Sequence, residues 1–395
     1  MRFGWDGDSR AVKLLRAIGL LIALLSFLAG REANAQLCAN PPCPLPEATG
    51  FANVASGSAA QDRVTNFLDD QSRRFAAGRR EISLTPAGRV ALAYDNVASD
   101  ARGGPFDAYA KASTGDAHAA VQRYRGWLEG YGSAARNDAQ NAFTGDHRRT
   151  YGGVAGIGAA ITPDVNIGFS VDQARTDVDV TAQPQHSRMD VTQLGLLLSA
   201  NSGPWTFGVA GVYGFGRTRS SRFDAIGEST ASYGMDMYGV IGEASYYWSN
   251  QGFRLVPKAG VDWTRVKVDP YSEVGGGVPV AASEQITERA RVYGALEVGY
   301  RKDAGAQVYD VSAYGKFIEI VSQDVGDLVI TPTAAAPGFV PGVIPGLVDA
   351  RFEFATGAAF NVRLSSVMQL YANYNGRFRQ GYDSHAGTLG MEVRW

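Results

Sequence analysis

The sequence contains few of the side chains from which most catalytic and metal sites are built. Its 395 residues include only two cysteines and four histidines, namely Cys38, Cys43, His118, His147, His186 and His385. The histidines are scattered and both cysteines lie near the N-terminus, so no group has the spacing of a metal site. We therefore expect no metal, no cofactor and no enzymatic activity.

An excess of charge of one sign is also lacking. The chain has 37 basic and 39 acidic residues, and its formal net charge is −2, so no nucleic-acid partner is expected. The glycines at 275–277 precede no helical pattern and do not predict a phosphate site. The cluster Asp383-Ser384-His385 contains the residue types of a hydrolase, but a polar loop is the simpler interpretation.

Long apolar runs are absent except at the N-terminus. Four basic residues occur within residues 1–16, an apolar run covers 17–29, and small residues follow at Ala33 and Ala35. The run is shorter than the roughly 20 residues that a membrane-spanning helix needs. This order predicts a secretory signal over residues 1–35, cleaved after Ala35. In an oxidising exported compartment, the two cysteines that follow could form a disulfide.

From residue 122 onward the sequence alternates between apolar and polar or small residues. We count twelve such segments, approximately 122–133, 148–161, 165–176, 187–200, 204–219, 231–248, 252–268, 284–301, 306–321, 350–363, 366–379 and 384–395. In the last one, Leu389 and Met391 share one face, while Thr388 and Glu392 share the other. Because successive strand residues point to opposite faces, each segment predicts a strand with one apolar face.

The connections between these segments distinguish a membrane barrel from a soluble sandwich. Short connections alternate with longer polar ones, which we place at 134–147, 177–186, 220–230, 269–283, 322–349 and 380–383. An outer-membrane barrel has short periplasmic turns, longer external loops and an even number of strands. The sequence therefore predicts an all-β membrane protein, a twelve-stranded antiparallel transmembrane β-barrel that closes because lipid cannot satisfy a sheet edge.

The region between signal and barrel, residues 36–121, contains one clear helical pattern. Residues 59–80 place apolar side chains at helical spacing with charges opposite, and the apolar positions are Val64, Phe67, Leu68 and Phe75. A second, weaker candidate is Phe106–Val121. A twelve-stranded barrel is wide enough to hold a helix, because its diameter grows with strand number. Either segment could therefore be a helix in the lumen.

Charged residues on the polar faces of the strands are expected to line the lumen, because each would cost several kcal/mol if turned to lipid. They are Glu243, Lys258, Asp262, Arg291, Glu297, Asp310, Lys316, Arg351, Glu353, Glu392 and Arg394. Their mixed signs fit pairing around a helix, in which Arg73 or Arg74 could meet Glu297 or Glu353. A merely hydrated wall fits equally well.

Several short motifs, taken in order, resemble those of the autotransporter β-domain family. They are GWLEGYG at 126–132, YGGVAG at 151–156, TPDVNIG at 162–168, GPWTF at 203–207 and MEVRW at 391–395. The resemblance implies a barrel that inserts into the outer membrane through the barrel-assembly machinery, with the help of periplasmic chaperones. It also implies that an N-terminal passenger crosses the membrane and that a helix remains in the pore. Family members typically end in phenylalanine, whereas this chain ends in Trp395.

These observations divide the chain into a signal peptide (1–35), a short passenger or linker (36–121) and a barrel (122–395). We expect a monomeric translocator in outer-membrane lipid that exports or displays its own short N-terminal segment. The alternative is a channel-like or structural surface barrel without a passenger. Met391, Val393 and Trp395 are the candidates for an assembly signal at the C-terminus.

Overall fold

The structure is a computed structural model that describes residues 49–76 and 123–395, apart from 225–226, 276–277, 305–306 and 334–338. It also gives the backbone of three short strands, β1 (Cys43–Pro44), β2 (Ile82–Leu84) and β3 (Val90–Leu92). The predicted signal and the second helix candidate, Phe106–Val121, lie outside the described residues.

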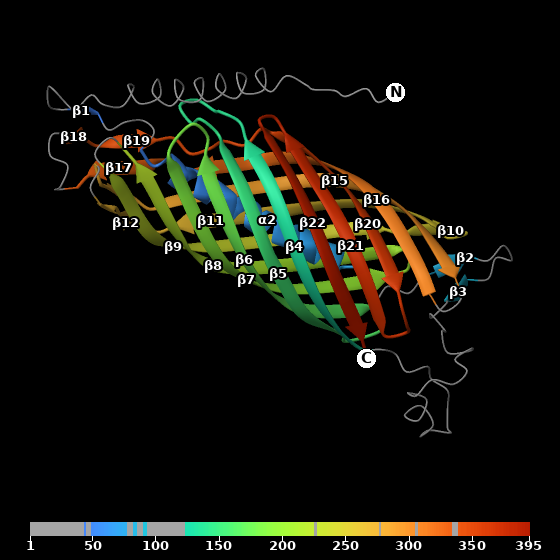
Figure 1. The fold of residues 1–395 in the computed structure, drawn as a ribbon. Helices are drawn as coiled ribbons and strands as arrows, with labels where there is room; N and C mark the ends of the chain where they lie inside the picture. The colour runs from blue at the N-terminus through green and yellow to red at the C-terminus, as the bar shows by residue number, and fades with distance from the viewer. Residues whose placement is uncertain are drawn as a thin grey trace, which may run out of the picture.

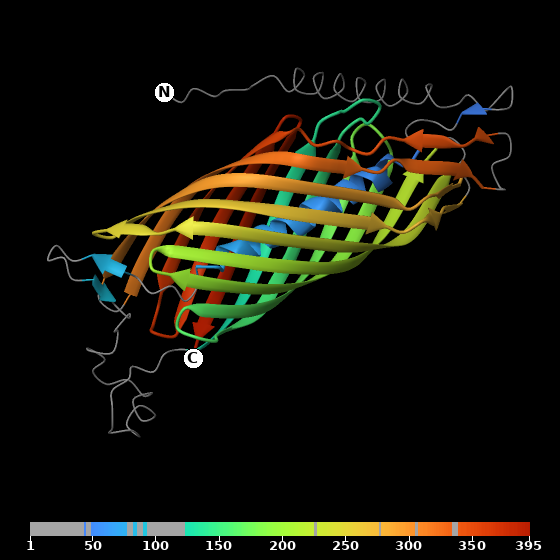
Figure 2. The same ribbon diagram turned by 180° about the vertical axis from the view of Figure 1, so that it is seen from behind.

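Twelve strands form a closed antiparallel barrel (Figures 1 and 2). They are β4 (Tyr124–Asn137), β5 (Asp146–Ala160), β6 (Val165–Val180), β7 (Gln185–Ser202), β8 (Trp205–Phe223), β9 (Glu228–Tyr246), β11 (Phe253–Val268), β15 (Gln285–Ala304), β16 (Gln307–Val325), β20 (Phe352–Arg363), β21 (Met368–Arg379) and β22 (Tyr382–Arg394). Each pairs with the next, and β22 pairs with β4, where Met391 lies opposite Leu128. Each predicted segment corresponds to one of these strands, so the predicted fold is confirmed.

The two faces of the wall differ as the alternation predicts. On β8 the outward side chains include Trp205, Val209 and Phe215, while the inward Ala210 and Thr218 are buried. The last strand gives the sharpest contrast, with Leu389 70% exposed and Glu392 4% exposed. The outer face therefore carries an apolar band for lipid, and the polar residues are enclosed.

The connections at one end of the barrel are short, and include residues 161–164, 203–204 and 364–367. At the other end, among the connections between described strands, three are long: 138–145, 269–284 and 326–351. The predicted long loop at 380–383 is wrong, because Gly381, with φ of 71°, forms a tight turn. Polar residues assigned to loops instead belong to strands that project beyond the apolar band, where both faces can be polar.

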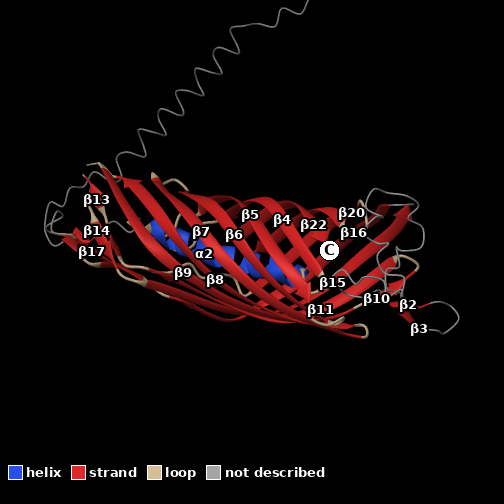
Figure 3. Cartoon of the chain, turned by 90° about the horizontal axis from the view of Figure 1, so that it is seen from below, coloured by secondary structure: helices blue, strands red, loops and turns tan. Residues whose placement is uncertain are grey.

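The two longest connections form a small sheet over the long-loop end of the barrel. It consists of β12 (Tyr271–Ser272), β14 (Val280–Ala282), β17 (Leu328–Pro332) and β19 (Gly342–Ile344). Beside it, β13 (Val274–Gly275) pairs with β9, and β18 (Phe339–Val340) pairs in parallel with β1. At the opposite end, β10 (Trp248–Asn250) pairs with β11 and lies near the β2–β3 hairpin (Figure 3).

One helix, α2 (Phe51–Arg73), runs through the lumen (Figure 3). Gly50 precedes it with φ of 93°, a conformation that favours glycine, and its carbonyl accepts from the backbone N–H groups of Asn53 and Val54. The helix predicted at 59–80 exists, but it begins earlier and ends before Gly78. Its first two turns consist mainly of small residues that fit a narrow lumen, and these carry little apolar periodicity.

No helix among the described residues is long and apolar enough to cross a lipid bilayer.

Candidate functional site: the helix in the barrel lumen

Two inward glycines allow the helix and the chain after it to approach the wall closely. A Cβ atom at Gly239 of β9 would lie 2.6 Å from Cγ1 of Val64, and one at Gly208 of β8 would lie 2.1 Å from the ring of Phe75. Side chains at these positions would collide with the apolar residues of α2 and its C-terminal extension. The two glycines therefore leave room for Val64 and Phe75 to pack directly against the wall.

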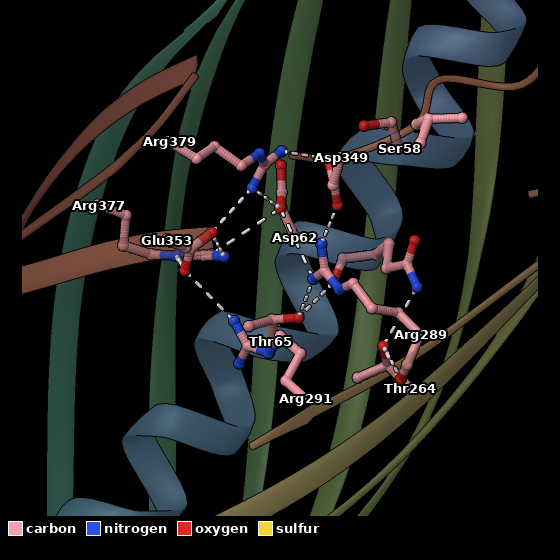
Figure 4. Close-up of polar contacts among 12 residues, drawn as sticks. Ser58, Asp62, Thr65, Thr264, Arg289, Arg291, Asp349, Glu353, Arg377 and Arg379 are labelled. Atoms are coloured by element: carbon pink, nitrogen blue, oxygen red, sulfur yellow. Dashed lines mark hydrogen bonds and ion pairs between the residues drawn. The ribbon is translucent and has the colours of Figure 1, made fainter. Parts of the chain in front are cut away.

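The helix also makes many polar contacts, and the densest group of ion pairs surrounds Asp62. Its carboxylate lies 2.8 Å from Arg148 of β5, and Arg289, Arg377 and Arg379 lie within 3.9 Å of it. Figure 4 shows three of these arginines reaching Asp62 from β15 and β21. The Asp62 side chain is only 8% exposed, so these contacts are largely shielded from water.

The arginines around Asp62 also bind carboxylates of the wall. Glu353 of β20 accepts from Arg291, Arg377 and Arg379, and Asp349 pairs with Arg289 and Arg379 (Figure 4). The five buried arginines of this cluster are Arg148, Arg289, Arg291, Arg377 and Arg379. The five carboxylates paired with them are Asp62, Asp146, Asp262, Asp349 and Glu353. The charges balance only when the helix contributes Asp62.

Arg63 binds the side of the wall formed by β4 and β6. Its guanidinium donates to the Asp172 carboxylate at 2.6 Å and to the Tyr131 hydroxyl. Tyr131 in turn donates to Asp172 at 2.6 Å. Asp62 and Arg63 are adjacent and carry opposite charges, so the helix fits a lumen whose charges differ from side to side.

The C-terminal end of α2 is held by two further ion pairs. Lys316 of β16 lies 2.8 Å from Asp69, and Arg74, just past the helix, pairs with Glu129 of β4. The Arg74 guanidinium also lies 4.3 Å from the ring centre of Trp127. The end of the helix is thus bound to two separate parts of the wall.

The N-terminal end of α2 meets the loop sheet and the tops of two strands. Tyr233 of β9 donates to Asn53 at 2.7 Å, Asn53 donates to Tyr271 of β12, and Ser56 hydrogen-bonds Ser187 at 2.6 Å. Burial, together with the neighbouring Tyr233 and Glu273, raises the pKa of the Tyr271 phenol well above its usual value. The phenol therefore remains a neutral donor and acceptor.

The structure places ten of the predicted charged residues on the inner side of the wall. Asp262, Arg291, Lys316, Glu353 and Glu392 are buried there. Glu243, Lys258, Glu297, Asp310 and Arg394 line two adjoining cavities, each of about 320 Å³, beside the C-terminal end of α2.

Arg351 is not in the lumen. Its side chain is 71% exposed and lies 2.6 Å from Glu319, and its guanidinium stands over the ring of outward-facing Phe352. The reason is that β20 begins at Phe352, so Arg351 belongs to the preceding loop and is not bound by the alternation.

The proposed helix partners were also wrong, because Arg73 pairs with Asp70 of its own helix and Arg74 with Glu129. The wall residues Arg148, Arg289, Arg377 and Arg379 were missed, although Arg289 lies on the same strand face as the predicted Arg291, two residues away. That alternation was a usable signal. The pairing of Asp62 with these arginines could not be predicted from the sequence, because it depends on the depth of the helix in the lumen.

The Asp383-Ser384-His385 cluster does not converge on a site. Ser384 is buried inside the barrel, whereas His385 faces outward and its Nδ1 lies 2.7 Å from the Tyr374 hydroxyl. These residues belong to β22, where neighbours point to opposite faces. Within the described residues, no group of three histidine, cysteine or acidic side chains could hold a metal ion.

A closed twelve-stranded barrel with an apolar outer band and a helix in a polar lumen has the architecture of an outer-membrane translocator domain. The family profile for the autotransporter beta-domain matches residues 126–375, and the chain therefore belongs to this family. The fold of the family implies a location in the bacterial outer membrane.

Solved structures show the same fold. The translocator domain of autotransporter NalP from Neisseria meningitidis is 13% identical, with a TM-score of 0.59, over 88% of this chain and all of that one. The beta domain of the Bordetella autotransporter BrkA is also 13% identical, with a TM-score of 0.53, over 69% of this chain and all of that one.

Two curated proteins are similar in sequence. Outer membrane protein B of Rickettsia typhi is 21% identical over 363 residues, which cover 88% of this chain and 21% of that protein. An extracellular serine protease of Serratia marcescens is 28% identical over 162 residues, which cover 40% of this chain and 15% of that protein. The match thus spans about a fifth or less of each relative.

Proposed function

We propose that the barrel is a translocator that carries the residues preceding α2 through its own lumen, displays them at the cell surface and keeps α2 as a plug. The main observation that supports this proposal is the direction of the helix. Its N-terminus lies under the loop sheet, where Ile344 and Leu328 approach Gly50. Its C-terminus lies toward the end where β4 begins and β22 ends (Figure 1).

This direction fits a chain that has passed outward through the barrel. Gly50 lies at the long-loop end of the lumen, and β1 pairs there with β18 of the longest loop. In an outer-membrane barrel, the end with short turns faces the periplasm and the end with longer loops faces outward. In this orientation Gly50 and β1 are on the outer side, while the two ends of the barrel sheet are on the periplasmic side.

The contacts of α2 support a plug rather than an open channel. Ion pairs join the helix to β5, β6, β16 and β21, on different sides of the lumen. The described cavities of about 320 Å³ near Arg73 lie beside the C-terminal end of the helix. A conducting pathway would require α2 to leave these partners.

The C-terminal strand supports assembly by the route that the family uses. Met391 and Trp395 face outward, and the backbones of Trp395 and Tyr124 exchange two hydrogen bonds of 2.9 and 3.0 Å. The terminal residue thus closes the last strand on the first, and its ring stacks on that of Tyr124 at 6.2 Å. Recognition by the assembly machinery would use this exposed apolar edge before closure.

The native cysteines permit a direct test of the direction. Intact cells are mildly reduced and treated with a membrane-impermeant maleimide, which should label Cys43 in the parent but not in a Cys38→Ser/Cys43→Ser variant. The matched control adds Ser365→Cys to that variant, in a short turn, and should remain unlabelled until the outer membrane is permeabilised. Labelling of Ser365→Cys but not Cys43 in intact cells would overturn the proposal.

Conductance tests the plug separately. The parent barrel in planar bilayers should show little current, and deletion of residues 49–76 should open a large conductance, because the lumen loses its helix. A parent barrel with a high conductance that does not change on deletion would show that it is a channel-like barrel.

A further inference from the structure

A cluster of arginines on the outer wall has no part in holding the helix. Arg149 of β5, Arg175 of β6, Arg188 of β7 and Arg217 and Arg219 of β8 all occupy outward positions. Their strands are neighbours in the barrel, so the five side chains form one surface, which we call the arginine patch. The register arranges them in two rows: Arg175, Asp190 and Arg217 in one, and Arg149, Asp177, Arg188 and Arg219 in the other.

The patch contains more cations than its own carboxylates can neutralise. Arg175 donates to Asp190 at 2.7 Å, and Arg188 donates to Asp177 at 2.8 Å. Among the described residues, Arg149, Arg217 and Arg219 form no ion pair. The nearby Asp179 is bound to His186 at 2.8 Å.

The arrangement of the unpaired arginines is unfavourable without a further anion. Arg219 lies directly opposite Arg188 in the register of β7 and β8, and like charges in that position repel. Arg217 lies two residues from Arg219 on the same face. Arg217 and Arg219 therefore present two adjacent unpaired guanidinium groups, with Arg149 in the same row as Arg219, and an oxyanion would stabilise this surface.

The height of the patch relative to the apolar band indicates which kind of anion it meets. On β8 the outward apolar series ends at Tyr213 and Phe215, and Arg217 and Arg219 follow immediately. With a strand rise of about 3.4 Å and a tilt near 40°, Arg217 lies roughly 5 Å and Arg219 roughly 10 Å above Phe215. Aromatic residues mark the membrane interface, so the guanidinium groups lie in the headgroup layer.

The adjoining part of the wall, beyond β9, lacks this surplus. The outward basic residues at the same end of β11 are Arg265, which lies 2.8 Å from Glu288, and Lys267, which lies 2.7 Å from Glu284. Both are thus neutralised by the neighbouring strand and its loop. The uncompensated charge is confined to one side, which is expected of a binding surface rather than of general solubility.

We propose that the arginine patch binds the phosphate group of an anionic lipid headgroup at the barrel surface. The proposal rests on the membrane insertion in the proposed function, because only insertion brings Arg217 and Arg219 to headgroup height. Each basic residue near an anionic membrane surface contributes roughly fivefold in affinity, so the three unpaired arginines together contribute about 100-fold.

The test uses the purified full mature chain in a neutral detergent and phosphatidic acid as the probe, because that lipid carries a phosphate monoester. Native mass spectrometry counts the lipid molecules retained, and phosphatidylcholine is the uncharged comparison. We expect the parent to retain phosphatidic acid selectively, and Arg149→Gln/Arg217→Gln/Arg219→Gln to bind it about 100-fold more weakly. The matched control, Arg265→Gln/Lys267→Gln, should bind like the parent.

Several results separate this proposal from others. Equal retention of both lipids by the parent, or equal loss in patch and control variants, would overturn it. Displacement of the lipid by millimolar inorganic phosphate would show a free-anion site instead, and retention that does not fall with added salt would exclude an ionic contact. If the triple variant does not fold, Arg219→Gln alone should still lose about fivefold. Heat-modifiable migration of each variant reports insertion independently, so a failure of the proposed function is visible separately.

Discussion

Replacing Asp62 by asparagine tests whether the helix is held by charge. The substitution keeps the shape of the side chain but removes the one helix carboxylate in a cluster with Arg148, Arg289, Arg377 and Arg379. Removing one partner from a buried ion pair typically costs about 3–5 kcal/mol, because the other charge remains buried. The cost of Asp62→Asn should therefore be large for a single isosteric change.

The remaining carboxylates place the effect at the lower end of that range. Arg148 keeps Asp146 at 2.7 Å, and Arg379 keeps Asp349 at 2.6 Å. We expect Asp62→Asn to lower the free energy of unfolding by about 3 kcal/mol. Urea unfolding of the purified barrel in detergent measures it, and single-channel recording should show openings that the parent lacks.

The matched control is Arg73→Gln, which removes a pair with Asp70 within the helix at a side chain that is 35% exposed. Because Arg73 is partly exposed and Asp70 keeps Arg74 at 3.5 Å, the loss should be less than about 1 kcal/mol. In the double variant Asp62→Asn/Arg379→Gln, part of the lost stability should return, because one uncompensated charge is gone. The reasoning would be refuted if the free energy of unfolding of Asp62→Asn lay within about 0.5 kcal/mol of the parent value and its single-channel recordings showed no more openings than those of the parent.

Three further predictions concern the wall and its closure. Val209→Arg, on the lipid face of β8, should lower the free energy of unfolding of the inserted barrel by roughly 2–4 kcal/mol. Asn373→Arg, which faces the cavity, should lower it far less. Equal effects of the two variants on urea unfolding would contradict the assigned faces. Gly239→Leu should lower the free energy of unfolding by about 1–3 kcal/mol, because the new side chain would push α2 away from the wall. Gly242→Leu, on the same strand, has open space around it and should be tolerated in the same assay. Deletion of Met391–Trp395 should leave the chain unfolded in the periplasm, and normal heat-modifiable protein would show that the closing strand is dispensable.

The strands could be predicted from the sequence because each has one face in contact with lipid and the other in contact with the polar lumen. A residue such as Leu389 cannot exchange faces with Glu392 without placing a charge in lipid, so the alternation is strict over the membrane band. Outside that band the constraint ends. Arg351 follows no alternation because it lies one residue before β20, and the turn at Gly381 was taken for part of a long loop.

The position of the helix could not be predicted from its apolar residues. Val64 and Leu68 belong to the predicted pattern and are buried, but the N-terminal turns contain Ala55, Ser56 and Gly57, which show no amphipathic periodicity. Small residues are selected by the width of the lumen. That width is set by strands whose contacts with the helix region span from 55 to 311 residues along the chain, and a local window of sequence carries no information about it.

Under the proposed function the lumen must first admit a moving chain, and a plug held by ion pairs suits such a lumen. Buried pairs contribute little net stability compared with apolar packing, but they penalise misplacement strongly. A shift of α2 by one helical turn would bring Ser58 or Asn66 to the level of Asp62, four residues away in either direction. Neither carries a charge, so the arginines of the wall would lose their helix partner, and Arg63 would leave Asp172 at the same time. The lumen therefore accepts one depth of the helix, and under the proposed function the same cluster would stop the exported chain at that point.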